Sequence, residues 1–180
     1  MAFRPAVLPF KSVISTPLFL FTMTEVPELP LEEIQQRMVG VWIGNFYSSS
    51  GYVGRKLGRK GLREYYDLGA RQVAGTFKHM GFSTPIQVAI AIATNEANLF
   101  GSKIEIEEAE DGCAVLDREH CAILAGAKAF SRIGASMLAK EHCKICSESH
   151  WRRVFSEMGM GLEVEKSEDG CLMRISPKKG

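Results

Sequence analysis

The spacing of hydrophobic residues changes partway along the chain, and this change predicts helices first and strands afterwards. In the first part, apolar residues recur every three or four positions, which is the period of one helix face. The segment from Pro30 shows this pattern, and Glu32 and Glu33 lie where the helix dipole favours acidic side chains. We predict a helix here that ends at the Ser-Ser-Ser-Gly segment 48–51.

Two further helices are predicted before the period changes. The first covers about 62–80 and stops at Gly81. The next has Thr84 as its cap and Pro85 in its first turn, and it runs to Gly101. This third helix is apolar nearly all round, so we expect it to be buried against other elements.

A period of two then indicates strands. The segment KIEIEEAEDGCAVLD alternates isoleucine with charged residues and turns at the Asp-Gly pair 111–112, which predicts a β-hairpin. The segment LEVEKSEDGCLMRI repeats this arrangement with its turn at 169–170. Helical stretches at about 121–139 and 147–158 lie between the hairpins. We therefore predict an α+β fold, in which N-terminal helices precede an antiparallel sheet of about four strands covered by helices.

Length and composition fit one domain. A chain of 180 residues with 46% hydrophobic and 24% charged residues can bury a single core. We predict a flexible or dispensable extension at 1–22 and a single domain at 23–180, with a helical part at 23–101 and a cysteine-containing α+β part at 102–180. The apolar run 13–23, interrupted by Pro17, is too short to predict a membrane span, and the extension is a candidate arm for a protein partner or a homo-oligomer.

Charge and motifs argue against nucleic acid as a partner. The net charge is +1, and the basic cluster 54–63 stands in a glycine-rich connection, where we expect a solvated loop or a contact with an anionic ligand. The segment 51–61 lacks the preceding strand and the ending of a phosphate-binding loop. We predict a small-molecule ligand instead. The odd number of cysteines, five, favours a reducing, cytoplasmic location with thiols kept for ligation or chemistry.

Two thiols and two imidazoles concentrate in the segment EHCKICSESHW, residues 141–151. On a helix, Cys143, Cys146 and His150 share one face, and three such donors are most of a tetrahedral zinc site. A fourth ligand would come from elsewhere in the chain. With zinc as the candidate cofactor, the candidate metal ligands are Cys121, His142, Cys143, Cys146, His150 and Cys171.

The same residues also suit nucleophilic catalysis, which leaves two functional interpretations open. A thiol at a helix start or beside an imidazole has a lowered pKa and attacks more readily. Cys121 and Cys146 are predicted to lie at helix starts, with His120 and His150 as candidate bases. Glu96, on the apolar third helix, is either a general acid or a carboxylate that reaches solvent. Simple packing is the third interpretation, since free cysteine is commonly buried.

From about Leu62 onward the chain resembles the L-2-amino-thiazoline-4-carboxylic acid hydrolase-like family. The segments that carry the resemblance are YYDLGARQVAGTFKHMGF, LFGSKIEIEE, DREHCAIL, CSES and GCLMRI, and the last three contain Cys121, Cys146 and Cys171. The resemblance implies a hydrolase that uses water to open a thiazoline ring or a related cyclic amidine at a C–N bond.

The C-terminal hairpin and glycines such as Gly126 and Gly134 also resemble the 4-vinyl reductase-type domain. That resemblance implies a non-catalytic module that binds a hydrophobic or tetrapyrrole-like small molecule. We expect the apolar cavity of such a module to be lined by Phe77, Met80, Phe100, Phe130 and Met137. A third possible function is an accessory subunit, which would dock through the N-terminal arm and the exposed aromatic candidates Trp42, Phe46 and Tyr47.

Overall fold

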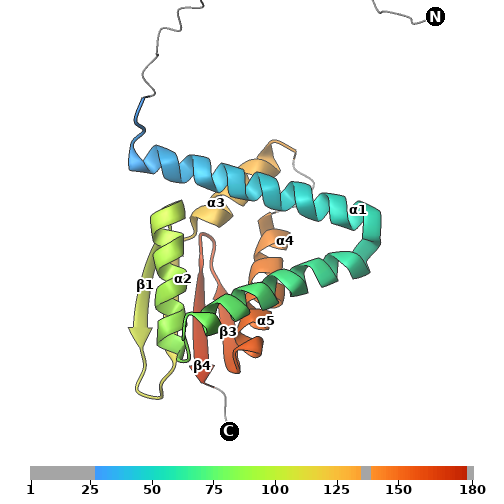
Figure 1. Ribbon diagram of the computed structural model, residues 1–180. Coiled ribbons are helices and arrows are strands. Elements are labelled where there is room, and N and C mark those ends of the chain that lie inside the picture. Colours follow the sequence, from blue (N-terminus) through green and yellow to red (C-terminus); the bar gives the residue numbers. More distant parts are fainter. Residues whose placement is uncertain (1–26, 135–138, 178–180) are drawn as a thin grey trace, which may run out of the picture.

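The computed structural model describes residues 27–134 and 139–177 and confirms the predicted α+β fold (Figure 1). Its elements are α1 (Leu31–His79), α2 (Pro85–Phe100), β1 (Lys103–Glu108), β2 (Ala114–His120), α3 (Ala122–Arg132), α4 (Ala139–Lys144), the π-helix η1 (Ile145–Trp151), α5 (Arg152–Glu157), β3 (Met160–Lys166) and β4 (Cys171–Pro177). The predicted extension 1–22 lies outside the described residues. Within these residues, no helix combines the length and the hydrophobicity needed to cross a membrane.

Helix α1 is one bent element where the sequence predicted two helices. Its backbone stays helical through the segment 48–51 and departs from helical angles at Gly58, with φ 65° and ψ −166°. Glycine adopts positive φ without strain because it has no Cβ, so a single residue redirects the helix. The bend separates a first arm, 31–57, from a second arm, 59–79 (Figure 1). The basic cluster 54–63 is therefore helical, and the prediction of a loop there is wrong.

Helix α2 begins and ends where the sequence predicted. Thr84 and Gln87 form a reciprocal cap, in which the Thr84 hydroxyl accepts from the Gln87 N–H and the Gln87 side chain accepts from the Thr84 N–H. Gly101 ends the helix in the left-handed conformation, with φ 76°. Helix α2 packs against α1, β1 and β2, as its apolar sequence predicted, and its outer side is open to solvent at Ile90, which is 51% exposed.

The four strands form one antiparallel sheet in the order β1-β2-β4-β3, so the two predicted hairpins lie side by side and join through β2 and β4. On β2, Ala114, Leu116 and Arg118 alternate with more exposed residues and face the helices. Helix α2 packs on β1 and β2, and α5 packs on β3. One face of the sheet is therefore covered and the other is open to solvent, as is common for antiparallel sheets.

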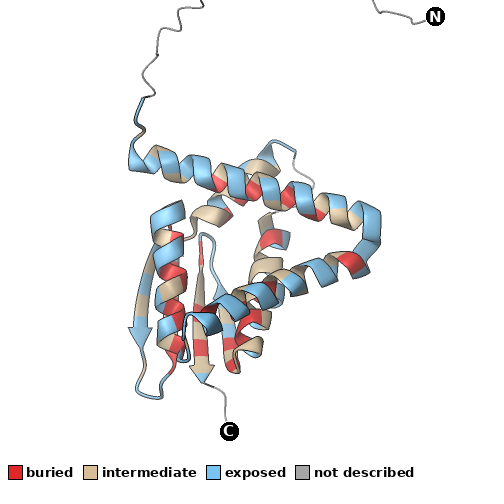
Figure 2. Ribbon diagram, viewed as in Figure 1, coloured by how far each residue is buried: buried red, intermediate tan, exposed pale blue. Residues whose placement is uncertain are grey.

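Two hydrophobic clusters hold the helices in place (Figure 2). The larger lies between the sheet, α2, α5 and the second arm of α1, and its fully buried side chains include Leu116, Phe155 and Met173. The smaller joins the first arm of α1 to α3. The two helices approach closely at Gly126, where a Cβ would lie 2.4 Å from Cγ1 of Val39. The space between these clusters is where the candidate site forms.

The segment after α3 differs from the prediction in its helix boundaries. Helix α3 ends at Arg132, and α4, η1 and α5 then follow one another without a break from Ala139 to Glu157. Cys146 therefore lies inside a helical run and not at a helix start, which removes the expected group of free N–H donors around its sulfur. Cys121 does lie at a helix start, as predicted, because it is the N-cap residue of α3.

Candidate functional site

A cavity of about 350 Å³ lies among both arms of α1, α3, the run α4–α5 and one end of the sheet. This volume is in the range of small-molecule sites in proteins. Four of the five cysteines and both tryptophans border it. Its lining residues are Trp42, Phe46, Tyr65, Tyr66, Leu68, Gly69, Gln72, Glu96, Arg118, Cys121, Ile123, Leu124, His142, Cys143, Ile145, Cys146, Ser147, His150, Trp151, Lys166, Gly170 and Cys171.

One side of the cavity is aromatic. Trp42 and Phe46 stack with ring centroids 5.4 Å apart, and the His142 ring meets both of them edge-on, at 5.7 Å and 5.2 Å. His142 is only 3% exposed, and its Nδ1 atom has no hydrogen-bond partner among the described residues. Its surroundings are those of an imidazole packed as an aromatic ring, and the wall it helps to form suits a flat, apolar ligand.

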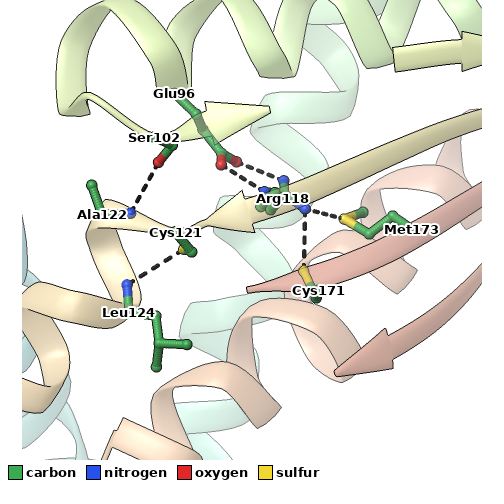
Figure 3. A network of polar contacts seen from close by, with 8 residues as sticks. All are labelled: Glu96, Ser102, Arg118, Cys121, Ala122, Leu124, Cys171 and Met173. Carbon is green, nitrogen blue, oxygen red and sulfur yellow. Dashed lines mark hydrogen bonds and ion pairs between the residues drawn. The ribbon is translucent and has the colours of Figure 1, made fainter. Parts of the chain in front are cut away.

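The opposite side contains a buried ion pair (Figure 3). Arg118 of β2 donates from Nε and Nη2 to the two carboxylate oxygens of Glu96 on α2, each at 2.7 Å. The exposed fraction of Arg118 is 3% and that of Glu96 is 9%. Charges are costly to bury, and the bidentate geometry offsets much of this cost. The expectation that Glu96 reaches solvent is therefore wrong, and its carboxylate balances a buried guanidinium.

Sulfur atoms complete the surroundings of this guanidinium. Nη1 of Arg118 donates to the sulfurs of Cys171, at 3.4 Å, and Met173, at 2.6 Å, both on the neighbouring strand β4 (Figure 3). The carboxylate of Glu96 strengthens the protonated form of Arg118 and raises its pKa, although burial alone would lower it. Thioethers and thiols are weak acceptors, so this side of the site combines one strong ion pair with polarisable sulfur.

Cys121 lies beside the ion pair at the junction of β2 and α3. Its sulfur accepts a hydrogen bond from the Leu124 N–H at 3.4 Å, and its own N–H donates to the Asp169 carbonyl at 2.8 Å. The hydroxyl of Ser102 accepts from the next N–H along, that of Ala122, at 3.1 Å (Figure 3). These contacts fix the first turn of α3 to the β3–β4 turn and hold the Cys121 thiol at the edge of the cavity.

The β3–β4 turn covers one end of the cavity, and it can do so because residue 170 is glycine. A Cβ at Gly170 would lie 1.6 Å from the carbonyl oxygen of Arg118. The Gly170 N–H donates to the Ser167 hydroxyl at 3.0 Å, which holds the turn in this position. The close backbone approach places Cys171 directly beside Arg118, its partner in the β2–β4 ladder.

Burial favours the protonated thiol at Cys121 and Cys146 and the uncharged imidazole at His142 and His150. It raises the pKa of Cys121 to about 11, although the Leu124 N–H and Arg118 act in the opposite direction. It raises the pKa of Cys146 well above its usual range. It lowers the pKa of His142 to about 4, and it lowers that of His150 as well. In the described part of the chain, no imidazole hydrogen-bonds to the sulfur of Cys121 or Cys146, so the contact expected of an activated thiol is not formed.

Most of the predicted site residues meet at this cavity. The candidate catalytic residues Cys121, Cys146, His150 and Glu96 border it, whereas His120, at the end of β2, does not. All six candidate metal ligands also border it. Even so, the described residues bring no three His, Cys, Asp or Glu side chains close enough together to hold a metal ion, so the geometry does not support the zinc prediction.

The expected apolar lining is wrong in its residues. Phe77 belongs to the large core, Met80 is 59% exposed, and Phe100 and Phe130 pack in the smaller cluster. Met137 lies outside the described residues. Of the aromatic residues expected to be exposed, Trp42 is 37% exposed, Phe46 is half-buried and Tyr47 is buried, and the first two border the cavity.

Two features of the site were missed by the sequence analysis. Arg118 was overlooked, although it follows Ala114 and Leu116 in the inward-facing alternation of β2, and a charged residue in that register indicates a buried partner. The π-helix η1 was not predicted either. Five of its seven residues border the cavity. Because π-helical turns are rare and occur often at functional sites, η1 independently marks this region.

No family model, curated protein or solved structure matches this chain. The fold and the cavity are therefore the observations on which a function can be proposed. Both resemblances seen in the sequence remain predictions.

Proposed function

We propose that this protein binds a small, mostly apolar, flat organic molecule in the cavity without transforming it. The observation that carries the proposal is the cavity itself, with an aromatic wall on one side and a self-neutralised ion pair with sulfur on the other. The protonated thiols of Cys121 and Cys146 and the uncharged imidazoles of His142 and His150 add no charge to the lining at neutral pH. A few fixed polar groups in a largely apolar lining are typical of binding sites for small molecules.

The two tryptophans give a direct test. Trp42 and Trp151 are the only tryptophans of the sequence, and both border the cavity, so intrinsic fluorescence reports on its occupancy. We expect titration with two-ring aromatic probes to change this fluorescence in a saturable way. The variants Trp42→Phe and Trp151→Phe should each keep part of the signal. A signal that does not saturate, or that neither tryptophan contributes to, would contradict the proposal.

A matched pair of glycine variants tests the location. Gly69 borders the cavity, and a side chain there would enter open space. Gly75 lies on the same arm, is exposed, has equally open surroundings and does not border the cavity. Both Gly→Leu changes favour the helix, so both variants should fold. We expect Gly69→Leu to weaken probe binding by about tenfold or more, which is about 1.4 kcal/mol, and Gly75→Leu to leave it unchanged.

Hydrolysis of a cyclic amidine or thiazoline is the second candidate. What favours it is that the thiols of Cys121 and Cys146 border the same cavity, with Cys121 at the N-terminus of α3. The raised pKa of Cys121 ranks this candidate second, since little thiolate is present at neutral pH. If Cys121 attacks the substrate, ring opening should rise with pH toward about 11 and stop in Cys121→Ala, while Cys113→Ala stays active. Turnover that survives in both Cys121→Ala and Cys146→Ala would remove this mechanism.

A further inference from the structure

A second hollow, open to solvent, lies beside the cavity, between the second arm of α1 and the run η1–α5. Its volume is about 590 Å³. Four arginines line it: Arg59 and Arg63 on α1, and Arg152 and Arg153 on α5. We call this hollow the arginine groove. The acidic residues that line it are fewer, Asp67 and Glu148.

The ion pairs around the arginine groove leave most of its positive charge uncompensated. Glu148 pairs with Lys166 at 3.1 Å, and Arg153 pairs with Glu157 at 2.8 Å. Arg59, Arg63 and Arg152 are exposed and form no ion pair with any described residue. Arg59 and Arg63 are also four residues apart on one helix face, where like charges disfavour the helix. No ion pair of the described residues offsets this repulsion, whereas an anion bound between the two guanidinium groups would.

The arginine groove and the cavity share a wall. Tyr66 of α1 and Ile145 of η1 line both hollows. A molecule that occupies the cavity and extends past these two residues would place its polar group in the groove. Guanidinium groups bind carboxylates and phosphates through paired hydrogen bonds, which makes an oxyanion the natural group for this position.

We infer that the ligand of the cavity is amphipathic and carries an oxyanion, which Arg59, Arg63 and Arg152 bind in the groove. This inference rests on the proposed function and adds the chemical class of the ligand. Arg118 does not take this role, because Glu96 already neutralises it inside the protein. The body of the ligand would thus contact the aromatic wall, on the first arm of α1 and on α4. Its oxyanion would contact arginines on the second arm of α1 and on α5.

Two probes of equal shape test the inference: 4-(1-naphthyl)butyrate, which carries a carboxylate, and its uncharged amide. Tryptophan fluorescence of the full chain measures the affinity of each. We expect the acid to bind about tenfold more tightly than the amide. In Arg59→Gln/Arg63→Gln/Arg152→Gln the acid should lose this advantage, while the amide keeps its affinity and so shows that the variant is folded. The three single variants should each lose part of the advantage.

A control variant separates local contacts from overall charge. Arg55→Gln/Arg71→Gln/Arg132→Gln removes the same charge at exposed arginines outside the groove and should keep the preference for the acid. Equal affinity of the acid and the amide for the unaltered protein would overturn the inference and leave the proposed function standing. Equal loss of the preference in the two triple variants would also overturn it. If neither probe binds, the inference and the proposed function fail together.

Discussion

The two hairpin turns have the same sequence, Glu-Asp-Gly-Cys, at 110–113 and 168–171, yet only the second belongs to the site. At the first turn, Arg174 of β4 pairs with Asp111 at 2.6 Å, and both side chains are exposed. At the second, Arg118 of β2 lies beside the cysteine, is buried and pairs with Glu96. The four residues specify a turn in both places. The environment of the second cysteine differs because Arg118 on β2, paired with Glu96 on α2, lies beside it.

The largest expected effect comes from unbalancing the buried arginine. Glu96→Gln keeps the shape of the side chain and leaves the Arg118 charge without its partner, so we expect the free energy of unfolding to fall by about 3–5 kcal/mol. Asp111→Asn, the matched change at the first turn, should not move the urea midpoint measurably, because surface ion pairs contribute little. Glu96→Leu combined with Arg118→Met should regain most of the loss. Equal effects of Glu96→Gln and Asp111→Asn would remove the contrast between the turns.

We expect acid to lower the stability of the fold through the buried histidines that border the cavity. Because the folded pKa of His142, about 4, lies below its ordinary value of 6.5, the unfolded chain binds this proton first as the pH falls. The contribution of uncharged His142 to the free energy of unfolding is fully present above pH 6.5. It is lost between pH 6.5 and 4, by about 3 kcal/mol in total. The lowered pKa of His150 adds to the loss in the same direction. The free energy of unfolding, measured with urea at several pH values, should depend less on pH in His142→Phe than in the unaltered protein.

We expect alanine to destabilise the protein for different reasons at Gly170 and at Gly112. Gly170→Ala places a Cβ against the Arg118 carbonyl, and we expect a loss of about 1–3 kcal/mol together with altered tryptophan circular dichroism at the cavity. At Gly112, where φ is 74°, alanine meets backbone strain of about 1–2 kcal/mol, and the cavity should keep its spectrum. If Gly170→Ala leaves both stability and spectrum unchanged, the close approach described for the second turn is wrong.

The smallest expected effect is a difference in thiol reactivity. Cys171 borders the cavity, whereas Cys113 is 5% exposed and does not. With N-ethylmaleimide and mass spectrometry of the folded protein, we expect Cys171 to react about tenfold faster than Cys113. A bound aromatic probe should slow the labelling of Cys171 only. Equal rates, or equal protection by the probe, would show that the turns do not differ in this way.

Much of the fold is predictable because short-range signals specify it. The cap at Thr84, the left-handed Gly101 and the two Asp-Gly turns lie where the sequence indicated, since each depends on neighbours within a few residues. The end of the first helix was predicted wrongly at 48–51, because serine and glycine residues often end a helix. The continuous packing of this arm overrides that weak local preference, and the helix departs from its path only at Gly58.

The site was less predictable because it depends on contacts between distant segments. The cysteine positions suggested a common cavity, and four of them border one. The residues before a cysteine do not indicate whether it borders the cavity, because Cys113 and Cys171 follow the same three residues. The role of Arg118 depends on Glu96, 22 positions earlier in the chain. The π-helix arises where α4 and α5 meet the rest of the fold, and we found no local signal for it.

The bend at Gly58 makes the width of the cavity depend on one backbone angle. Trp42 and Tyr66, which both border the cavity, belong to the same helix on either side of that bend. About 24 Å of helix separates Trp42 from the bend. Over that length, a rotation of about 10° would displace the ring by about 4 Å, enough to widen the aperture by roughly the thickness of an aromatic ring. Entry of a flat molecule by such a rotation would also have to move α3, which packs on this arm at Val39 and Gly126, but would leave the sheet in place.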